Sequence, residues 1–150
     1  MAGGHFKQGK YIIPERYRSK YIGNYNNIVY RSKWEKTFMD YLCQSSNVKR
    51  WNSEDLVIKY YNDLDGRIHE YYIDFYVEID KGDGIINKYW IECKPYSQTI
   101  PPKQTNNPKT YMYQMKAYIT NMSKWKYAKE AASRNGAKFK VLTERSGISF

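Results

Sequence analysis

The residues of this chain best suited to chemistry are two carboxylates and a lysine within apolar segments. Asp74 lies in the segment YYIDFYV, and Glu92 and Lys94 lie in the segment YWIECKP. Both segments are rich in aromatic and β-branched residues, which predicts strands. Because residues two apart share one face of a strand, Glu92 and Lys94 should point the same way.

Carboxylates amid apolar side chains indicate a bound cation, because buried charges are costly unless they are paired. Carboxylate oxygens suit Mg²⁺, and this ion suits the chemistry of phosphate esters. The pattern therefore predicts a metal-dependent nuclease with Mg²⁺ as cofactor and Mn²⁺ able to substitute. The simpler alternative is a turn cap or an edge charge at Asp74 and a solvent-facing ion pair between Glu92 and Lys94. We favour the metal site, because an acid followed by acid-x-Lys on the next strand is a less common pattern.

A third carboxylate, Glu35, lies on a predicted helix over residues 32–44. Trp34, Phe38 and Leu42 recur there at helical spacing, and Glu35 lies beside this apolar stripe. Ser32 and Glu35 also form an S-x-x-E capping box, in which the glutamate reaches back to the Ser32 amide. Helix capping and a role at the metal both stay open for Glu35.

Glu35 on a helix, Asp74 on a strand and Glu92-x-Lys94 on the next strand resemble the motif of the PD-(D/E)xK nuclease superfamily. The segments RSKWE, DF and WIECK are similar to those of transposon-end nucleases. The whole chain, from the opening MAGGHFKQGKY onward, resembles the head-completion nucleases of large tailed bacteriophages. One departure is Ile73, which stands where the superfamily motif has proline.

The resemblance implies a restriction-endonuclease-like α/β fold and hydrolysis of phosphodiester bonds in double-stranded DNA. Asp74, Glu92 and the backbone carbonyl of Cys93 would hold one Mg²⁺, and Glu35 would complete the shell or bind a second ion. Lys94 would orient the attacking water or stabilise charge developing on the phosphate.

The resemblance also implies a setting and one auxiliary residue. Gln114 begins a Q-x-x-x-Y pattern that some superfamily members carry near the metal; the alternative is a polar residue on a half-buried helix. The expected setting is late phage assembly in the host cytoplasm or at the phage head, with head or portal proteins as partners. Two rival functions are a non-catalytic head-completion protein that binds the portal and a transposon-end endonuclease subunit. No apolar run reaches membrane-spanning length, so no membrane partner is expected.

Charge is distributed unevenly along the chain. Residues 1–50 hold 10 basic and 3 acidic residues (+7), residues 51–100 hold 5 and 10 (−5), and residues 101–150 hold 10 and 2 (+8), which gives the net charge of +10. A basic flank on each side of an acidic centre predicts DNA binding by the flanks and metal binding by the centre. The candidate DNA-binding residues are Arg16, Arg18, Lys20, Arg31, Lys33, Lys103 and Lys109.

The pattern of elements predicts a mixed β-sheet flanked by helices, with a basic N-terminal arm. Residues 1–30 show no clear period and are expected to form an extended arm that contacts DNA or wraps the core, and residues 31–150 form the nuclease domain. Strands are expected over 55–61, 67–79, 85–93 and 139–143, with the last one parallel to its neighbour. A proline-containing loop follows Lys94, and two helices over 111–121 and 123–135 follow the loop.

Overall fold

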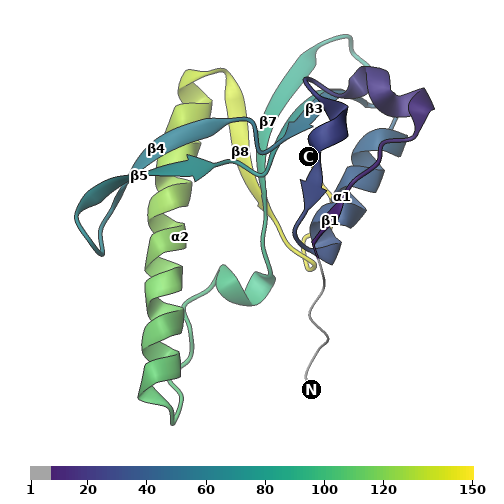
Figure 1. The fold of residues 1–150 in the computed structure, drawn as a ribbon. Coiled ribbons are helices and arrows are strands. Elements are labelled where there is room, and N and C mark those ends of the chain that lie inside the picture. The colour runs from purple at the N-terminus through teal and green to yellow at the C-terminus, as the bar shows by residue number, and fades with distance from the viewer. Residues whose placement is uncertain (1–7) are drawn as a thin grey trace.

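The computed structural model describes residues 8–150, and its centre is a four-stranded mixed sheet. The strand order is β3-β6-β7-β8, with antiparallel pairing from β3 to β7 and parallel pairing of β7 with β8. Figure 1 shows these strands between the two long helices. The bounds are Val48–Ser53 (β3), Phe75–Asp80 (β6), Ile86–Cys93 (β7) and Ala137–Leu142 (β8).

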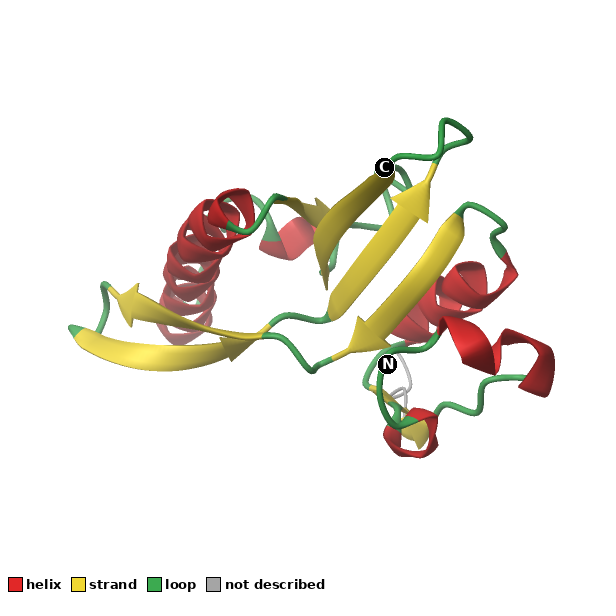
Figure 2. Ribbon diagram, turned by 90° about the horizontal axis from the view of Figure 1, so that it is seen from above, coloured by secondary structure: helices red, strands yellow, loops and turns green. Residues whose placement is uncertain are grey.

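Two helices flank this sheet, as Figure 2 shows from above. Helix α1 (Lys33–Gln44) packs beside β3, and helix α2 (Pro108–Arg134) packs along β8 and a separate hairpin. That hairpin is a two-stranded sheet of β4 (Val57–Asn62) and β5 (Arg67–Tyr72). Among residues 8–150, no helix combines the length and the apolar character that crossing a bilayer demands. The expected architecture, a mixed sheet flanked by helices, is confirmed.

Hydrophobic side chains form two clusters, one on each side of the molecule. The larger cluster joins α1 to the main sheet and includes Phe38, Trp51 and Phe75, all fully buried. The smaller cluster joins α2 to the hairpin and includes Tyr71, Ile73 and Ala128. The segment that links β5 to β6 runs from the smaller cluster to the larger one, so it lies at the seam between them.

The N-terminal segment is packed against the larger cluster, and the expected extended arm is not confirmed for residues 8–30. Tyr11, Ile13 and Ile28 are buried in that cluster, which gives the segment a fixed place. The part of the predicted arm within residues 1–7 lies outside the described residues. The short elements of the segment are β1 (Gly9–Lys10), two 3₁₀ turns (Glu15–Lys20 and Tyr25–Asn27) and β2 (Val29–Tyr30).

Three local predictions were wrong. The single strand expected over 67–79 is two strands in different sheets, because the chain crosses from hairpin to main sheet at Ile73 and Asp74. Strand β3 was missed. The two helices expected after the loop are one helix that begins at Pro108, where proline fits the first helical position, and ends before Gly136, whose φ is +70°.

Candidate active site

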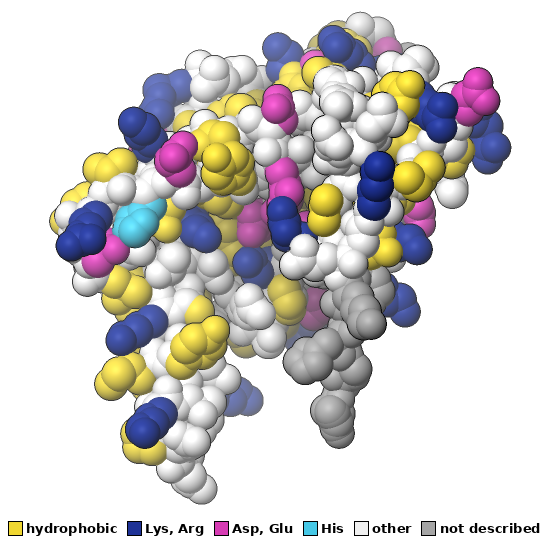
Figure 3. Space-filling model, viewed as in Figure 1, with side chains coloured by type: hydrophobic (Ala, Val, Ile, Leu, Met, Phe, Trp, Pro, Cys, Tyr) yellow, Lys and Arg dark blue, Asp and Glu magenta, His cyan; other side chains and the backbone are white. Residues whose placement is uncertain are grey.

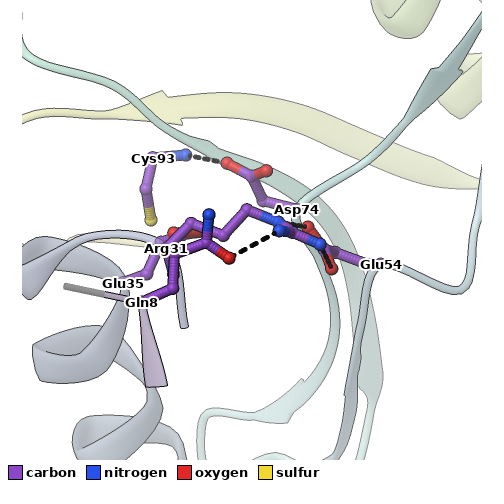
Figure 4. Close-up of polar contacts among 6 residues, drawn as sticks. All are labelled: Gln8, Arg31, Glu35, Glu54, Asp74 and Cys93. Carbon is purple, nitrogen blue, oxygen red and sulfur yellow. Dashed lines mark hydrogen bonds and ion pairs between the residues drawn. The ribbon is translucent and has the colours of Figure 1, made fainter. Parts of the chain in front are cut away.

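Asp74 occupies the bend between β5 and β6, not the interior of a strand. Its Oδ2 accepts a hydrogen bond of 2.8 Å from the backbone N–H of Cys93, at the end of β7. Its backbone carbonyl accepts a 3.0 Å hydrogen bond from the N–H of Glu54. These contacts, drawn in part in Figure 4, fix the carboxylate beside the end of the central strand.

Glu92 is buried near the end of β7, and both its oxygens have partners. The Tyr71 hydroxyl donates a short hydrogen bond to Oε2. The Lys94 ammonium lies 3.4 Å from Oε1. Glu92 and Lys94 therefore lie on one side of the strand, as their spacing predicted.

The Glu92 carboxylate lies close enough to Asp74 to affect the pKa of Asp74. Burial and the nearby Glu92 carboxylate hold the pKa of Asp74 well above its usual range, although the Cys93 amide opposes that rise. Burial and the same negative neighbours raise the pKa of the Cys93 thiol as well. The pocket thus carries more negative charge than Lys94 alone offsets, which is the electrostatic environment that a bound cation relieves.

Glu35 stands at the third position of α1 and does cap the helix, although by a variant of the predicted bond. Its N–H donates to the Ser32 hydroxyl at 3.1 Å, and its Oε2 accepts from the N–H of Arg31, not of Ser32, at 2.9 Å. Burial raises the pKa of Glu35, and Glu54 adds to the rise. The Arg31 N–H engages one oxygen of the Glu35 carboxylate, and the Ser32 hydroxyl also contacts this carboxylate.

Arg31 lies close to the carboxylates of Glu35, Glu54 and Asp74, as Figure 4 shows. Its guanidinium bonds both oxygens of Glu54, at 2.7 and 3.1 Å, and Gln8 at 3.1 Å. Glu54 holds a left-handed backbone with φ of 53°, which an L-residue adopts only under constraint. Sequence analysis missed both Glu54 and Tyr71, because neither stands in a motif.

The predicted DNA-binding residues fall into two groups. The ammonium of Lys20 donates to three backbone carbonyls at the end of α1, those of Leu42, Cys43 and Ser45, at 2.7 to 3.3 Å. Lys20 therefore stabilises a helix end, and we leave it out of the proposed DNA contact. Arg18 bonds the Ile13 carbonyl. The exposed members Arg16, Lys33, Lys103 and Lys109, together with Arg31, stay predictions.

A magnesium site fits these residues in part. Within residues 8–150, no three His, Cys, Asp or Glu side chains stand close enough together to form a complete metal site. Mg²⁺ commonly uses only one or two carboxylates and fills its remaining positions with water and substrate phosphate. Asp74, Glu92 and the Cys93 carbonyl match that donor set, and Figure 3 shows acidic and basic side chains side by side above the hollow next to α2.

Comparisons with known proteins identify the family of this chain. Residues 45–144 match the family model described as TnsA-like endonuclease N terminal. The chain belongs to the TnsA-like endonuclease family. It is also 34% identical over 131 residues to the head completion nuclease of Enterobacteria phage T4, covering 84% of this chain and 85% of that protein. No solved structure matches the chain significantly.

The part matched by the TnsA-like family model runs from just before β3 to just after β8. It contains Asp74, Glu92 and Lys94 but neither Glu35 nor the N-terminal segment. The family model therefore covers the sheet that carries the two central carboxylates. Gln114 also lies inside it, on α2, where it lines a cavity together with the loop that follows Lys94.

Proposed function

We propose that this TnsA-like endonuclease family member is a metal-dependent nuclease that hydrolyses phosphodiester bonds in double-stranded DNA. The observation that carries the proposal is the close pair of carboxylates, half-buried Asp74 and buried Glu92, with Lys94 3.4 Å from Glu92 at the end of the central strand. A structural protein gains nothing from burying two acids together, because the cost of desolvating them is large. A site that holds a cation explains why both are present.

Asp74, Glu92 and the Cys93 carbonyl would hold the Mg²⁺, with Mn²⁺ able to substitute. The bound ion supplies Lewis acidity and lowers the pKa of a coordinated water. Tyr71 fixes one Glu92 oxygen through its hydroxyl, and the Cys93 amide fixes one Asp74 oxygen, so each carboxylate keeps a set direction. This support lowers the cost of ordering the site when substrate arrives.

Lys94 would stabilise the negative charge that gathers on the phosphate, or orient the attacking water. Among the described residues, its ammonium pairs with Glu92 alone, so it keeps N–H groups available for substrate. Glu35 would complete the site with the oxygen that does not accept from Arg31, directly or through water.

The setting follows from kinship with the phage T4 protein, whose name gives it a nuclease role in head completion. We propose the same setting for this chain, in which it processes packaged DNA in the host cytoplasm or at the phage head, with head or portal proteins as partners. The net charge of +10 supports a polyanionic substrate, since basic residues gain affinity by releasing counterions from DNA.

Nicking of supercoiled plasmid DNA tests the proposal. We expect nicking with Mg²⁺ or Mn²⁺, none with excess chelator, and a loss on the order of a thousandfold or more in Asp74→Ala or Glu92→Ala. DNA binding by the two variants, followed by fluorescence anisotropy, should stay near that of the wild type. Near-normal nicking in either variant under Mg²⁺ would refute the assignment, and a wild-type protein that binds DNA without nicking it would favour a structural role.

A further inference from the structure

A cavity lined by both apolar and polar side chains lies between α2 and the loop that follows Lys94. It has two connected parts of about 540 and about 380 Å³, which share Gln98, Tyr113, Ala117 and Asn121 as lining residues. Gln98 belongs to the 3₁₀ turn Tyr96–Gln98 in that loop, and Figure 1 shows this turn beside α2. Cavities of this size accept small organic ligands.

Asn121 is the most informative residue of the cavity. Only 7% of the residue is exposed, and it lines both parts of the cavity. Within residues 8–150, no hydrogen bond to the Asn121 amide is found. Solvent still reaches the Asn121 amide through the cavity, so its donor and acceptor atoms are available to a ligand there.

The other lining residues define the chemistry of that group. Tyr113 is 77% exposed at the rim and offers an aromatic face. Lys94 and Lys116 line the smaller part and offer positive charge. Ala117 lines both parts of the cavity from an exposed position of the helix, and its small side chain leaves the space open.

We propose that this cavity binds one unpaired nucleotide of the DNA substrate. The Asn121 and Gln98 amides would bond the edge of the base, Tyr113 would stack on its face, and Lys116 would contact its phosphate. Lys94 joins the cavity to the reaction centre, because it lines the cavity and lies 3.4 Å from Glu92. The nucleotide beside the cleaved phosphate would thus leave the duplex stack.

This inference rests on the proposed function for its biological meaning, but it has a binding test of its own. The probe is thymidine 5′-monophosphate, titrated into the full chain in the presence of a chelator so that no cleavage can occur. Chemical shifts of backbone amides in an isotope-labelled sample report binding. We expect saturable shifts at Lys94, Gln98 and residues 113–121, and a much weaker response to inorganic phosphate at the same concentrations.

Two variants decide whether the cavity is the site. Ala117→Leu fills the space from an exposed helical position, and Asn121→Leu replaces the amide by an apolar group of similar volume. Both should weaken binding of the nucleotide at least tenfold. Ser133→Leu, which adds similar bulk on an exposed position near the far end of the same helix, is the matched control and should bind normally.

Stability separates lost recognition from lost folding. Asn121→Leu removes an amide that has no protein partner within residues 8–150, so its melting temperature should stay close to that of the wild type. Equal nucleotide affinity in all three variants, or phosphate binding as tight as nucleotide binding, would overturn the proposal. If the protein binds the nucleotide here but nicks no plasmid, the nucleotide site stands and the proposed nuclease function is refuted. If it nicks plasmid but does not bind the nucleotide, the nuclease function stands and the nucleotide site is refuted.

Discussion

The two walls beside the candidate reaction centre use their hydrophobic side chains in opposite ways. The wall formed by residues 8–44 buries Tyr11, Ile13, Phe38 and Met39 in the main core. The other wall, the N-terminal half of α2, leaves Met112 and Tyr113 exposed by 59% and 77%. One wall is thus fixed by packing, and it carries Glu35, while the other borders an open cavity.

This difference indicates that the packed wall positions catalytic groups and the open wall receives substrate. Catalytic carboxylates must be held within a fraction of an ångström, and well-packed elements hold them best. Side chains that receive a substrate must stay accessible before it binds. The sheet between the two walls carries Asp74 and Glu92, so the reaction centre lies where the fixed part of the molecule meets the open part.

The largest difference between the two walls is expected in the free energy of unfolding of two methionine variants. Met39→Ala in α1 should lower the free energy of unfolding by about 2–5 kcal/mol, because Met39 is fully buried and its loss leaves a cavity. Met112→Ala in α2 should change it by less than about 0.5 kcal/mol. Urea denaturation of both variants measures the difference, and similar losses would show that the two walls are equally packed.

The next prediction tests whether the packed wall contributes to the chemistry. Glu35→Gln keeps an oxygen that can accept from the Arg31 amide, so the helix cap and the melting temperature should hardly change. Plasmid nicking should nevertheless fall on the order of a hundredfold, because the variant has no charge to offer the metal. A fully active variant would restrict Glu35 to capping.

A smaller effect is expected at Tyr71, which belongs to the hairpin and supports Glu92 from the α2 side. Tyr71→Phe removes the hydroxyl that donates to Glu92 Oε2 but keeps the ring in its cluster. A hydrogen bond to a charged group contributes roughly 1.5–3 kcal/mol, so nicking should fall about tenfold or more. The Mg²⁺ concentration for half-maximal activity should rise, and an unchanged metal dependence would contradict a positioning role.

Sequence reasoning worked where local pattern decides the structure. The Ser32 cap and the apolar stripe predicted a helix over 32–44, within one residue of the observed α1. The strand predicted before Cys93 is also observed. The parallel pairing of β8 followed from the helical crossover before it. The two-residue spacing placed Glu92 and Lys94 on one side of a strand, as observed.

It failed where tertiary contacts decide the structure. The aromatic and β-branched run over 67–79 shows no break, yet the chain leaves one sheet for another at Asp74. Strand β3 reads VKRWNS, and the charged pair Lys49 and Arg50 hides its weak alternation. Tyr71 reaches Glu92 from the hairpin, and Glu54 reaches Arg31 from the residue after β3, and no local sequence motif indicates either contact.

Melting temperatures of the wild type and Asp74→Asn, with and without Mg²⁺, test the central claim most directly. Because the pKa of Asp74 is raised in the folded protein, the folded state holds a proton that the unfolded chain releases above about pH 4. Stability without metal should therefore fall as pH rises through that window to the raised pKa of Asp74. Asp74→Asn lacks this penalty, since asparagine carries no charge.

At pH 8 without metal, Asp74→Asn should thus melt higher than the wild type, and the gap should close as the pH approaches 4. Adding Mg²⁺ should raise the melting temperature of the wild type and leave that of the variant nearly unchanged, because only the wild type holds the ion. If Mg²⁺ shifts both proteins equally, or shifts neither, the buried carboxylates are not a metal site and the account fails.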